Sequence, residues 1–261
     1  MHPLSIPFSR LGLAAGLVVV AMLLSRREAL GLERELAVGA LRAAVQLIVI
    51  GYVLLLLISH EHWASVALAL AAMLGTAAVT AARRVEHGPS ARVLAPRALV
   101  AIGAAALVAL VPVFACIVRP SPWFDARYVV PIGGMMFSSA MNVVAQVFER
   151  IFAQAHAEAA TVEQWLALGA TPRQALASVV RAALRAAMIP TINGLVTVGL
   201  VALPGMMTGQ ILSGAAPEQA VRYQIVVMYQ LVAVAAVAGA LSAMFATRLL
   251  FTSRSQLRRR W

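Results

Sequence analysis

Residues Gln224–Leu249 read QIVVMYQLVAVAAVAGALSAMFATRL, 26 residues in which Arg248 is the single charged side chain. A second stretch, Ala98–Val118, reads ALVAIGAAALVALVPVFACIV and has no charged residue in 21 positions. About 20 consecutive apolar residues are enough for a helix to cross the hydrocarbon core of a bilayer. Inside lipid the backbone groups must be paired within the segment, which such a stretch achieves as a helix. The two stretches therefore predict an all-α, polytopic membrane protein.

Other apolar stretches of similar length predict additional spans. They are Val38–Ile58, Trp63–Ala82, Val129–Phe148 and Met188–Leu212. A shorter run, Leu11–Leu24, has 14 residues without a charge and becomes long enough if Leu4–Arg10 joins it and Arg10 snorkels to the interface. We expect this run to be retained as the first of about seven spans, because it lacks the basic flank and the cleavage site of a signal peptide.

Composition excludes several classes of protein. The chain is 62% apolar and 12% charged, whereas soluble domains are roughly half apolar and a quarter charged. This excludes a soluble globular fold and a disordered chain. The 21 basic residues, against 10 acidic ones, are all arginine, so the chain lacks the lysine of an ATP-binding P-loop. The single cysteine, Cys116, excludes an internal disulfide and a multi-cysteine metal site.

The arginines also predict how the spans are oriented. If the loops alternate between the two sides of the membrane, sixteen arginines lie on the side of the C-terminus and four on the other side. Cytoplasmic loops carry the excess of positive charge, so we expect the N-terminus outside and the C-terminus in the cytoplasm. Arg42, within the second span, either snorkels to the inner interface or contacts an anion there. All acidic residues fall in loops or at span ends, which argues against a proton-driven carrier.

The long connection 149–187, on the predicted cytoplasmic side, has the pattern of a helical elbow. Thr171-Pro172 is typical of an N-cap followed by proline at the first helical position. Gly169 can end the preceding helix as its C′ residue. We therefore expect one helix, a tight corner over Gly169-Ala170-Thr171-Pro172, and a second helix that returns to the membrane. The alternative is an amphipathic segment on the membrane surface.

A short motif in this elbow resembles the segment by which many permeases of ABC importers dock their ATPases. Glu163 precedes Gly169 with the same spacing as the glutamate and glycine of that motif. Gln164 and Trp165 replace its two alanines, and the downstream proline, Pro190, lies farther away than usual. The elbow is therefore expected to couple to an ATPase through Glu163, Gly169, Ala170, Thr171 and Pro172.

The sixth predicted span makes the resemblance specific. Residues Ile189–Gly214 read IPTINGLVTVGLVALPGMMTGQILSG, and shorter strings support them. These strings are RAAVQLIVIGYVL from Arg42, PIGGMM from Pro131, LGATPRQA from Leu168 and RAALRAAMIP from Arg181. Over roughly residues 26–250 the chain resembles the bacterial iron-export (Fet-type) ABC transporter permease family, formerly an uncharacterised integral membrane family, which has plant relatives linked to aluminium tolerance.

The resemblance implies one membrane permease domain over residues 1–261, in the bacterial inner membrane and without catalytic residues of its own. It implies a separate ATPase subunit that binds ATP-Mg, while this chain binds no cofactor. A homodimer of permeases and contact with membrane lipid are expected, and nucleic acid is not. The cargo would be iron or a metal-linked solute. Two alternatives stay open: a sugar nucleotide, lipid or other organic anion as cargo, or a stand-alone carrier without an ATPase.

Polar residues and helix breaks within the spans suggest the translocation path. Discontinuous helices are typical of transporter binding sites, and Pro190 and Pro204-Gly205 interrupt the sixth span. The candidate path residues are Gln46, Asn142, Asn193, Pro204, Gly205, Met206, Met207 and Gln210. Helix packing is an equally good explanation for Gly205 and Gly209, and methionines also fill apolar gaps. No metal site is expected, since His60-Glu61-His62 lacks the spacing of a zinc helix.

Overall fold

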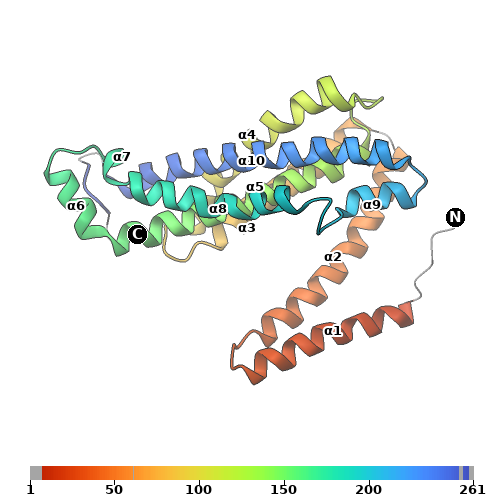
Figure 1. Cartoon of the computed structure of the whole chain (residues 1–261), viewed down its shortest axis with the longest axis horizontal. Helices are drawn as coiled ribbons and strands as arrows, with labels where there is room; N and C mark the ends of the chain where they lie inside the picture. Colours follow the sequence, from red (N-terminus) through yellow and green to blue (C-terminus); the bar gives the residue numbers. More distant parts are fainter. Residues whose placement is uncertain (1–7, 61, 253–254, 259–261) are drawn as a thin grey trace. The chain divides into compact units, whose positions relative to one another are not determined.

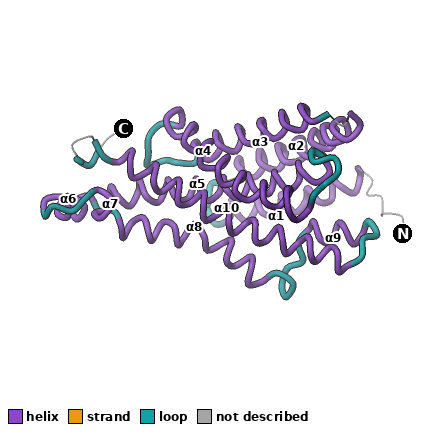
Figure 2. The backbone as a smooth tube through the Cα atoms, turned by 90° about the horizontal axis from the view of Figure 1, so that it is seen from above, coloured by secondary structure: helices purple, strands orange, loops and turns teal. Residues whose placement is uncertain are grey.

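The computed structural model describes residues 8–60, 62–252 and 255–258. Apart from two isolated bridges, Val198 with Ala202 and Phe251 with Leu257, these residues form helices, turns and loops only (Figure 2). The all-α class is therefore confirmed. The helices are α1 (Phe8–Arg27), α2 (Glu33–His60), α3 (Trp63–Arg83), α4 (Ala91–Pro112), the π-helix η1 (Val113–Val118), α5 (Ala126–Ala157), α6 (Ala159–Ala167), α7 (Pro172–Ala175), α8 (Ala177–Thr197), α9 (Gly205–Leu212) and α10 (Pro217–Leu250).

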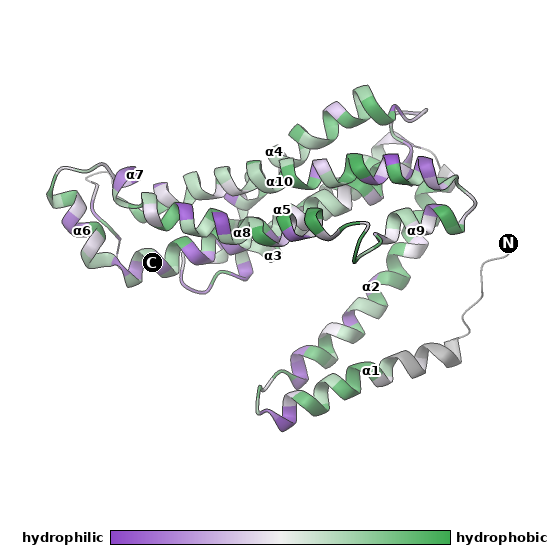
Figure 3. Ribbon diagram, viewed as in Figure 1, coloured by the Kyte–Doolittle hydropathy of each residue, from purple (hydrophilic) through white to green (hydrophobic). Residues whose placement is uncertain are grey.

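Helices long and apolar enough to cross a bilayer account for most of the expected spans. Six segments of the described chain qualify: Glu33–Ser59, Trp63–Arg83, Ala91–Val118, Ala126–Ala157, Ala177–Thr197 and Pro217–Leu250. Apolar residues cover most of α4, while hydrophilic residues gather in the turns and around α7 (Figure 3). The expected first span is helical, since α1 has 20 residues, but it is not among the six. The total of about seven spans stays a prediction.

The chain divides into two compact units, of which the smaller is the α1–α2 hairpin together with residues 212–214. Ala29 and Gly31, both at positive φ, form the turn between its helices. Ser25 is 3% exposed there, donates a 3.1 Å hydrogen bond to Oε1 of Glu33 and accepts one of 3.1 Å from the amide of Leu32. One buried hydroxyl therefore fixes both sides of the turn.

The larger unit is organised around α5, which packs against α3, α4, α8 and α10 (Figure 1). The largest fully buried side chains of α5 include Phe148, Phe152 and Ile151. Small residues let the surrounding helices approach closely. A Cβ atom on Gly133 would lie 2.8 Å from Cδ2 of Leu70 in α3, and one on Gly239 of α10 would lie 3.1 Å from Cδ2 of Leu184 in α8. The tight contacts α3–α5 and α8–α10 thus depend on glycine.

The sixth predicted span, Met188–Leu212, differs from the expected arrangement. Pro190 does not interrupt a helix, because α8 continues through it from Ala177 to Thr197. Proline is tolerated inside membrane helices when neighbouring groups satisfy the freed backbone. The break comes later, at residues 198–204, where Gly199 has φ of +81° and Val198 pairs with Ala202. Pro204 then precedes the short helix α9, which begins at Gly205, so only the interruption predicted at Pro204-Gly205 is confirmed.

The C-terminal end of α4 is irregular in a way that hydropathy does not predict. After Pro112 the helix widens into the π-helix η1, a form that often accompanies a local disturbance of the helical hydrogen bonds. Gln230 of α10 is 4% exposed, and its Nε2 donates a 3.1 Å hydrogen bond to the carbonyl of Ala109. This buried bond ties α10 to the disturbed end of α4.

Candidate functional site

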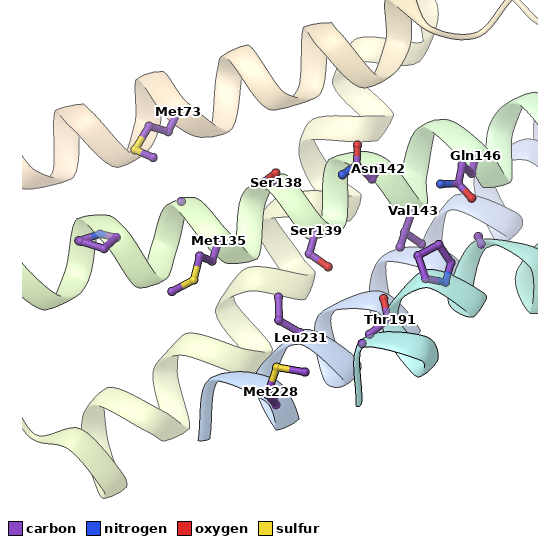
Figure 4. A pocket seen from close by; sticks show the side chains of 15 residues that line it. Met73, Met135, Ser138, Ser139, Asn142, Val143, Gln146, Thr191, Met228 and Leu231 are labelled. Carbon is purple, nitrogen blue, oxygen red and sulfur yellow. The ribbon is translucent and has the colours of Figure 1, made fainter. Parts of the chain in front are cut away.

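The larger unit contains an open groove of about 710 Å³ between α3, α5, α8 and α10 (Figure 4). Its lining residues are Met73, Pro131, Gly134, Met135, Ser138, Ser139, Asn142, Val143, Gln146, Ala187, Pro190, Thr191, Gly194, Met228 and Leu231. Because all four helices are candidate membrane spans, the groove is a candidate for a cargo path.

The side chains in the groove are neutral. Thioethers come from Met73 of α3, Met135 of α5 and Met228 of α10, while hydroxyl and amide groups come from α5 and α8 (Figure 4). Every lining residue is uncharged. Such a surface can accept a solute through many weak polar and apolar contacts, and methionine adapts its shape to irregular cargo.

Most of the polar groove residues form one stripe along α5. Pro131, Met135, Ser138, Asn142 and Gln146 follow one another at intervals of three or four residues, the spacing of a single helical face. This face opens to the groove, whereas Phe148 and Phe152 are buried in the core. The helical spacing of Ser138, Asn142 and Gln146 is the sequence signal for this stripe, and Asn142 is its one member among the predicted path residues.

The eight predicted path residues are not brought together at this groove. Asn142 lines it, and Gln46 lies exposed on α2 in the smaller unit. Asn193 lies exposed on α8, outside the lining. The remaining five, in Pro204–Gln210, lie at the start of and within α9 and do not line the groove either. Their roles in a path stay predictions.

A second hollow, of about 210 Å³, adjoins the groove and is charged. We call it the arginine cleft, and its lining is Arg84, Asn142, Ala145, Gln146, Glu149 and Arg150. Asn142 and Gln146 line both hollows. Nη1 of Arg84 donates a 2.8 Å hydrogen bond to Oδ1 of Asn142, which holds the guanidinium where the groove and the cleft meet.

Glu149 is already engaged by the loop between α3 and α4. Its Oε2 accepts hydrogen bonds of 2.7 Å and 3.3 Å from the amides of Glu86 and His87, and its Oε1 pairs with Nδ1 of His87. The pKa of His87 is raised above 6.5, chiefly by this hydrogen bond and then by the charge of the Glu149 carboxylate. Gly88 completes the contact, since a Cβ there would lie 2.5 Å from Cδ2 of Phe152. The α3–α4 loop is thus fastened to α5.

The elbow has the backbone geometry that its sequence predicts. The amide of Gly169 donates to the carbonyl of Leu166, and that of Ala170 donates to the carbonyl of Trp165, both at 3.0 Å. With Gly169 at φ of +88°, these bonds form a Schellman motif that ends α6. Thr171 then caps α7 in a capping box with Gln174. The predicted corner is confirmed, although Glu158 separates α5 from α6 and Leu176 separates α7 from α8.

The elbow buries one side and exposes the other. Val162, Ala175 and Leu176 are buried in the same core as α5 and α10. Trp165 and Leu168 are 54% and 81% exposed next to Gly169, at the end of the unit where α6 and α7 project (Figure 1). The corner is therefore held by buried residues on one side and presents exposed apolar side chains on the other. A partner protein can cover an apolar surface of this kind.

Groups of three or more histidine, cysteine or acidic side chains that could hold a metal ion do not occur among the described residues. Glu61 is outside those residues, so the predicted weakness of His60-Glu61-His62 as a metal site is not tested. Cys116 is exposed within the π-helix η1. Among the residues that line the groove, the side chains that could act as soft metal ligands are therefore the thioethers of its methionines.

Comparisons with known proteins agree with the resemblance drawn from the sixth span. The chain matches the model of an uncharacterised protein family, UPF0014, over residues 8–251. It is 35% identical over 257 residues to the "Probable iron export permease protein FetB" of Escherichia coli K12, which covers 98% of this chain and 97% of that protein. It is 39% identical over 244 residues to "UPF0014 membrane protein STAR2" of Oryza sativa subsp. japonica, covering 94% of this chain and 84% of that protein. It is 37% identical over 246 residues to "Protein ALUMINUM SENSITIVE 3" of Arabidopsis thaliana, covering 94% of this chain and 88% of that protein. No solved structure matches the chain.

Proposed function

This multi-pass chain belongs to the UPF0014 membrane protein family, and we propose that it is the permease subunit of an ABC transporter that exports iron or a metal-linked solute. The observation that carries the proposal is the similarity to a protein named as an iron export permease along 98% of this chain. A match of this extent covers the groove, the arginine cleft and the elbow together. The whole chain, residues 1–261, acts as one permease domain of the bacterial inner membrane.

ATP hydrolysis belongs to a second subunit that binds ATP-Mg. The elbow is the proposed contact with that subunit, because Trp165 and Leu168 present apolar surface beside the rigid corner Gly169–Pro172. Glu163 lies on the same short helix α6. The amides of Gly169, Ala170 and Thr171 all donate hydrogen bonds, so the corner resists bending, as coupling to a soluble ATPase requires.

The groove is the proposed cargo path, and two permease chains would together enclose it. An open groove beside candidate spans α3, α5, α8 and α10 needs a cover that excludes lipid when polar cargo is bound. A second copy of the chain provides such a cover, in agreement with the expected homodimer. Gln46 of α2, Asn193 of α8 and Pro204–Gln210 at α9 would contribute in other states of the transport cycle.

The form of the metal follows from the lining of the groove. Iron prefers nitrogen, oxygen or thiolate ligands, whereas thioethers suit softer ions such as Cu(I). The groove offers thioether, hydroxyl and amide groups. A metal whose coordination sphere is filled by a chelator suits this surface better than a bare ion.

Purification with native partners tests the assignment. The chain, extracted from native membranes in mild detergent, should carry a stoichiometric subunit with a Walker A motif, and its ATP hydrolysis should be sensitive to vanadate. A matched control is the double variant Trp165→Ser and Leu168→Ser, which should insert and fold but lose the subunit. Transport by the chain alone, insensitive to vanadate, would instead establish a stand-alone carrier. An organic anion as cargo is the other alternative, and stimulation of ATP hydrolysis by candidate solutes would reveal it.

A further inference from the structure

We infer that the arginine cleft is a binding site for an oxyanion, a phosphate or carboxylate group, at the mouth of the groove. Arg84 and Arg150 both line this hollow of about 210 Å³. A water molecule takes about 30 Å³ of liquid, so the hollow has room for an oxyanion and part of its hydration shell. Two guanidinium groups are the side chains best suited to bind planar or tetrahedral oxygens.

The charge balance of the cleft favours an anion. Glu149 is the one acidic residue in the lining, and its carboxylate already accepts from two backbone amides and pairs with His87. Arg150 is exposed and, within the described part of the chain, makes no hydrogen bond or ion pair. Its full charge is therefore available to a ligand.

The side chain of Arg84 is held in place before an anion binds. Its bond to Asn142 uses one N–H of the guanidinium, and the other N–H donors of that fork remain for an anion. Because the side chain is already held, binding costs less conformational entropy than it would for a free arginine. The amide groups of Asn142 and Gln146 then continue from the cleft into the groove.

The position of the cleft suggests which cargo can enter. Arginines at a mouth repel a bare metal cation and attract an anion. The cargo would therefore arrive as an anion, or as a metal held in a chelate of net negative charge. This assignment to the cargo rests on the proposed transport function, whereas the anion site itself does not. A phospholipid headgroup offers the same phosphate chemistry and is the other possible source of the ligand.

Titration of inorganic pyrophosphate tests the site on the full chain, reconstituted in nanodiscs of phosphatidylcholine and followed by calorimetry. We expect saturable binding that weakens with added salt. Arg84→Gln and Arg150→Gln should each weaken it at least about tenfold, the effect of losing one charge-assisted pair. Arg92→Gln is the matched control, since Arg92 is an exposed arginine outside the cleft, and its binding should stay unchanged. Arg84→Lys should retain more binding than Arg84→Gln.

The site would be overturned if the native chain did not bind pyrophosphate. It would also be overturned if Arg92→Gln weakened pyrophosphate binding as much as Arg84→Gln and Arg150→Gln do. The source of the ligand is decided by repeating the titration with phosphatidylglycerol in the nanodiscs. Competition by that lipid identifies a headgroup, and unchanged affinity identifies a free anion. Binding at the cleft without any ATP-dependent transport would contradict the proposed function alone. Transport without pyrophosphate binding would contradict the site alone.

Discussion

A Cβ atom added to Gly134 of α5 would lie 2.7 Å from Cε of Met73 in α3. The flexible thioether end of Met73 therefore occupies space that a side chain at position 134 would need. Both residues also line the groove, so this contact helps to determine how much of the candidate path is open at this point.

Enlarging Gly134 should close the groove. Gly134→Ala should be tolerated, because the methyl end of Met73 can move aside, while Gly134→Leu should reduce transport at least about tenfold through loss of space and cargo contacts. Gly75→Leu is the matched control on α3, since no atom lies within 4 Å of a Cβ there. Transport assays in vesicles, with size-exclusion profiles as a check on folding, measure the difference. Equal transport in the two leucine variants would show that the groove is not the path.

The corner of the elbow should be sensitive to its backbone conformation. Gly169 has φ of +88° in open space, so Gly169→Val strains the backbone by about 1–2 kcal/mol without a steric clash. We expect that variant to insert normally but to lose most of the coupling between ATP hydrolysis and transport. Gly31→Val imposes a similar strain at φ of +70°, also in open space, and should leave coupling intact. The ratio of ATP hydrolysed to cargo moved distinguishes them, and full coupling in Gly169→Val would refute the assignment of the elbow.

Two buried glutamines should differ in their response to replacement by leucine. Oε1 is buried without a hydrogen-bond partner in both Gln224 and Gln230, so replacement removes the same unfavourable group from each. Nε2 of Gln230 also donates to the carbonyl of Ala109, and Gln230→Leu leaves that carbonyl without its donor. Gln230→Leu should therefore be less stable than Gln224→Leu by about 1 kcal/mol. Thermal unfolding in detergent compares the two. A lower midpoint for Gln224→Leu than for Gln230→Leu would contradict this account of the α4–α10 contact.

The loop fastened by His87 should loosen as the pH rises. The pKa of His87 is raised above 6.5 by the hydrogen bond to Glu149 and then by its charge, so folding favours the protonated imidazole. The contribution of this pair to the stability of the fold is complete below pH 6.5 and is lost as the pH rises through the raised pKa of His87. Between about pH 6 and about pH 9, the native chain should therefore lose more thermal stability than His87→Gln. Glu149→Gln removes the partner of His87 and should reduce the pH dependence in the same way. An identical pH dependence in His87→Gln would show that the pair contributes nothing.

Local chemistry made the elbow predictable from the sequence. Gly169 and Thr171-Pro172 signal a helix end and a helix start within a few residues, and the structure forms a Schellman motif and a capping box there. The spans of α4 and α10 were equally clear, because more than 20 mostly apolar residues in succession leave few alternatives in lipid.

Features that depend on neighbouring helices were less predictable. Pro190 reads as a helix breaker, yet α8 continues through it, and the break falls at residues 198–204. The groove needs four helices, so Met73 and Met228 could be associated with it only once the helices were packed. The arginine cleft was hidden for the same reason, because Arg84 and Arg150 are distant in sequence and each reads as an ordinary charge at a span end.

The central claim, that this chain is the membrane path of an ATP-driven exporter of a metal species, is tested most directly by uptake into inside-out vesicles. Vesicles that contain the chain and its ATPase subunit would receive ATP-Mg and iron(III) citrate from outside, because the cytoplasmic face of an inside-out vesicle is turned outward. The account predicts accumulation of iron inside that requires ATP, stops with vanadate and is lost in Gly134→Leu. Accumulation that proceeds without ATP, or that vanadate leaves unchanged, would contradict it.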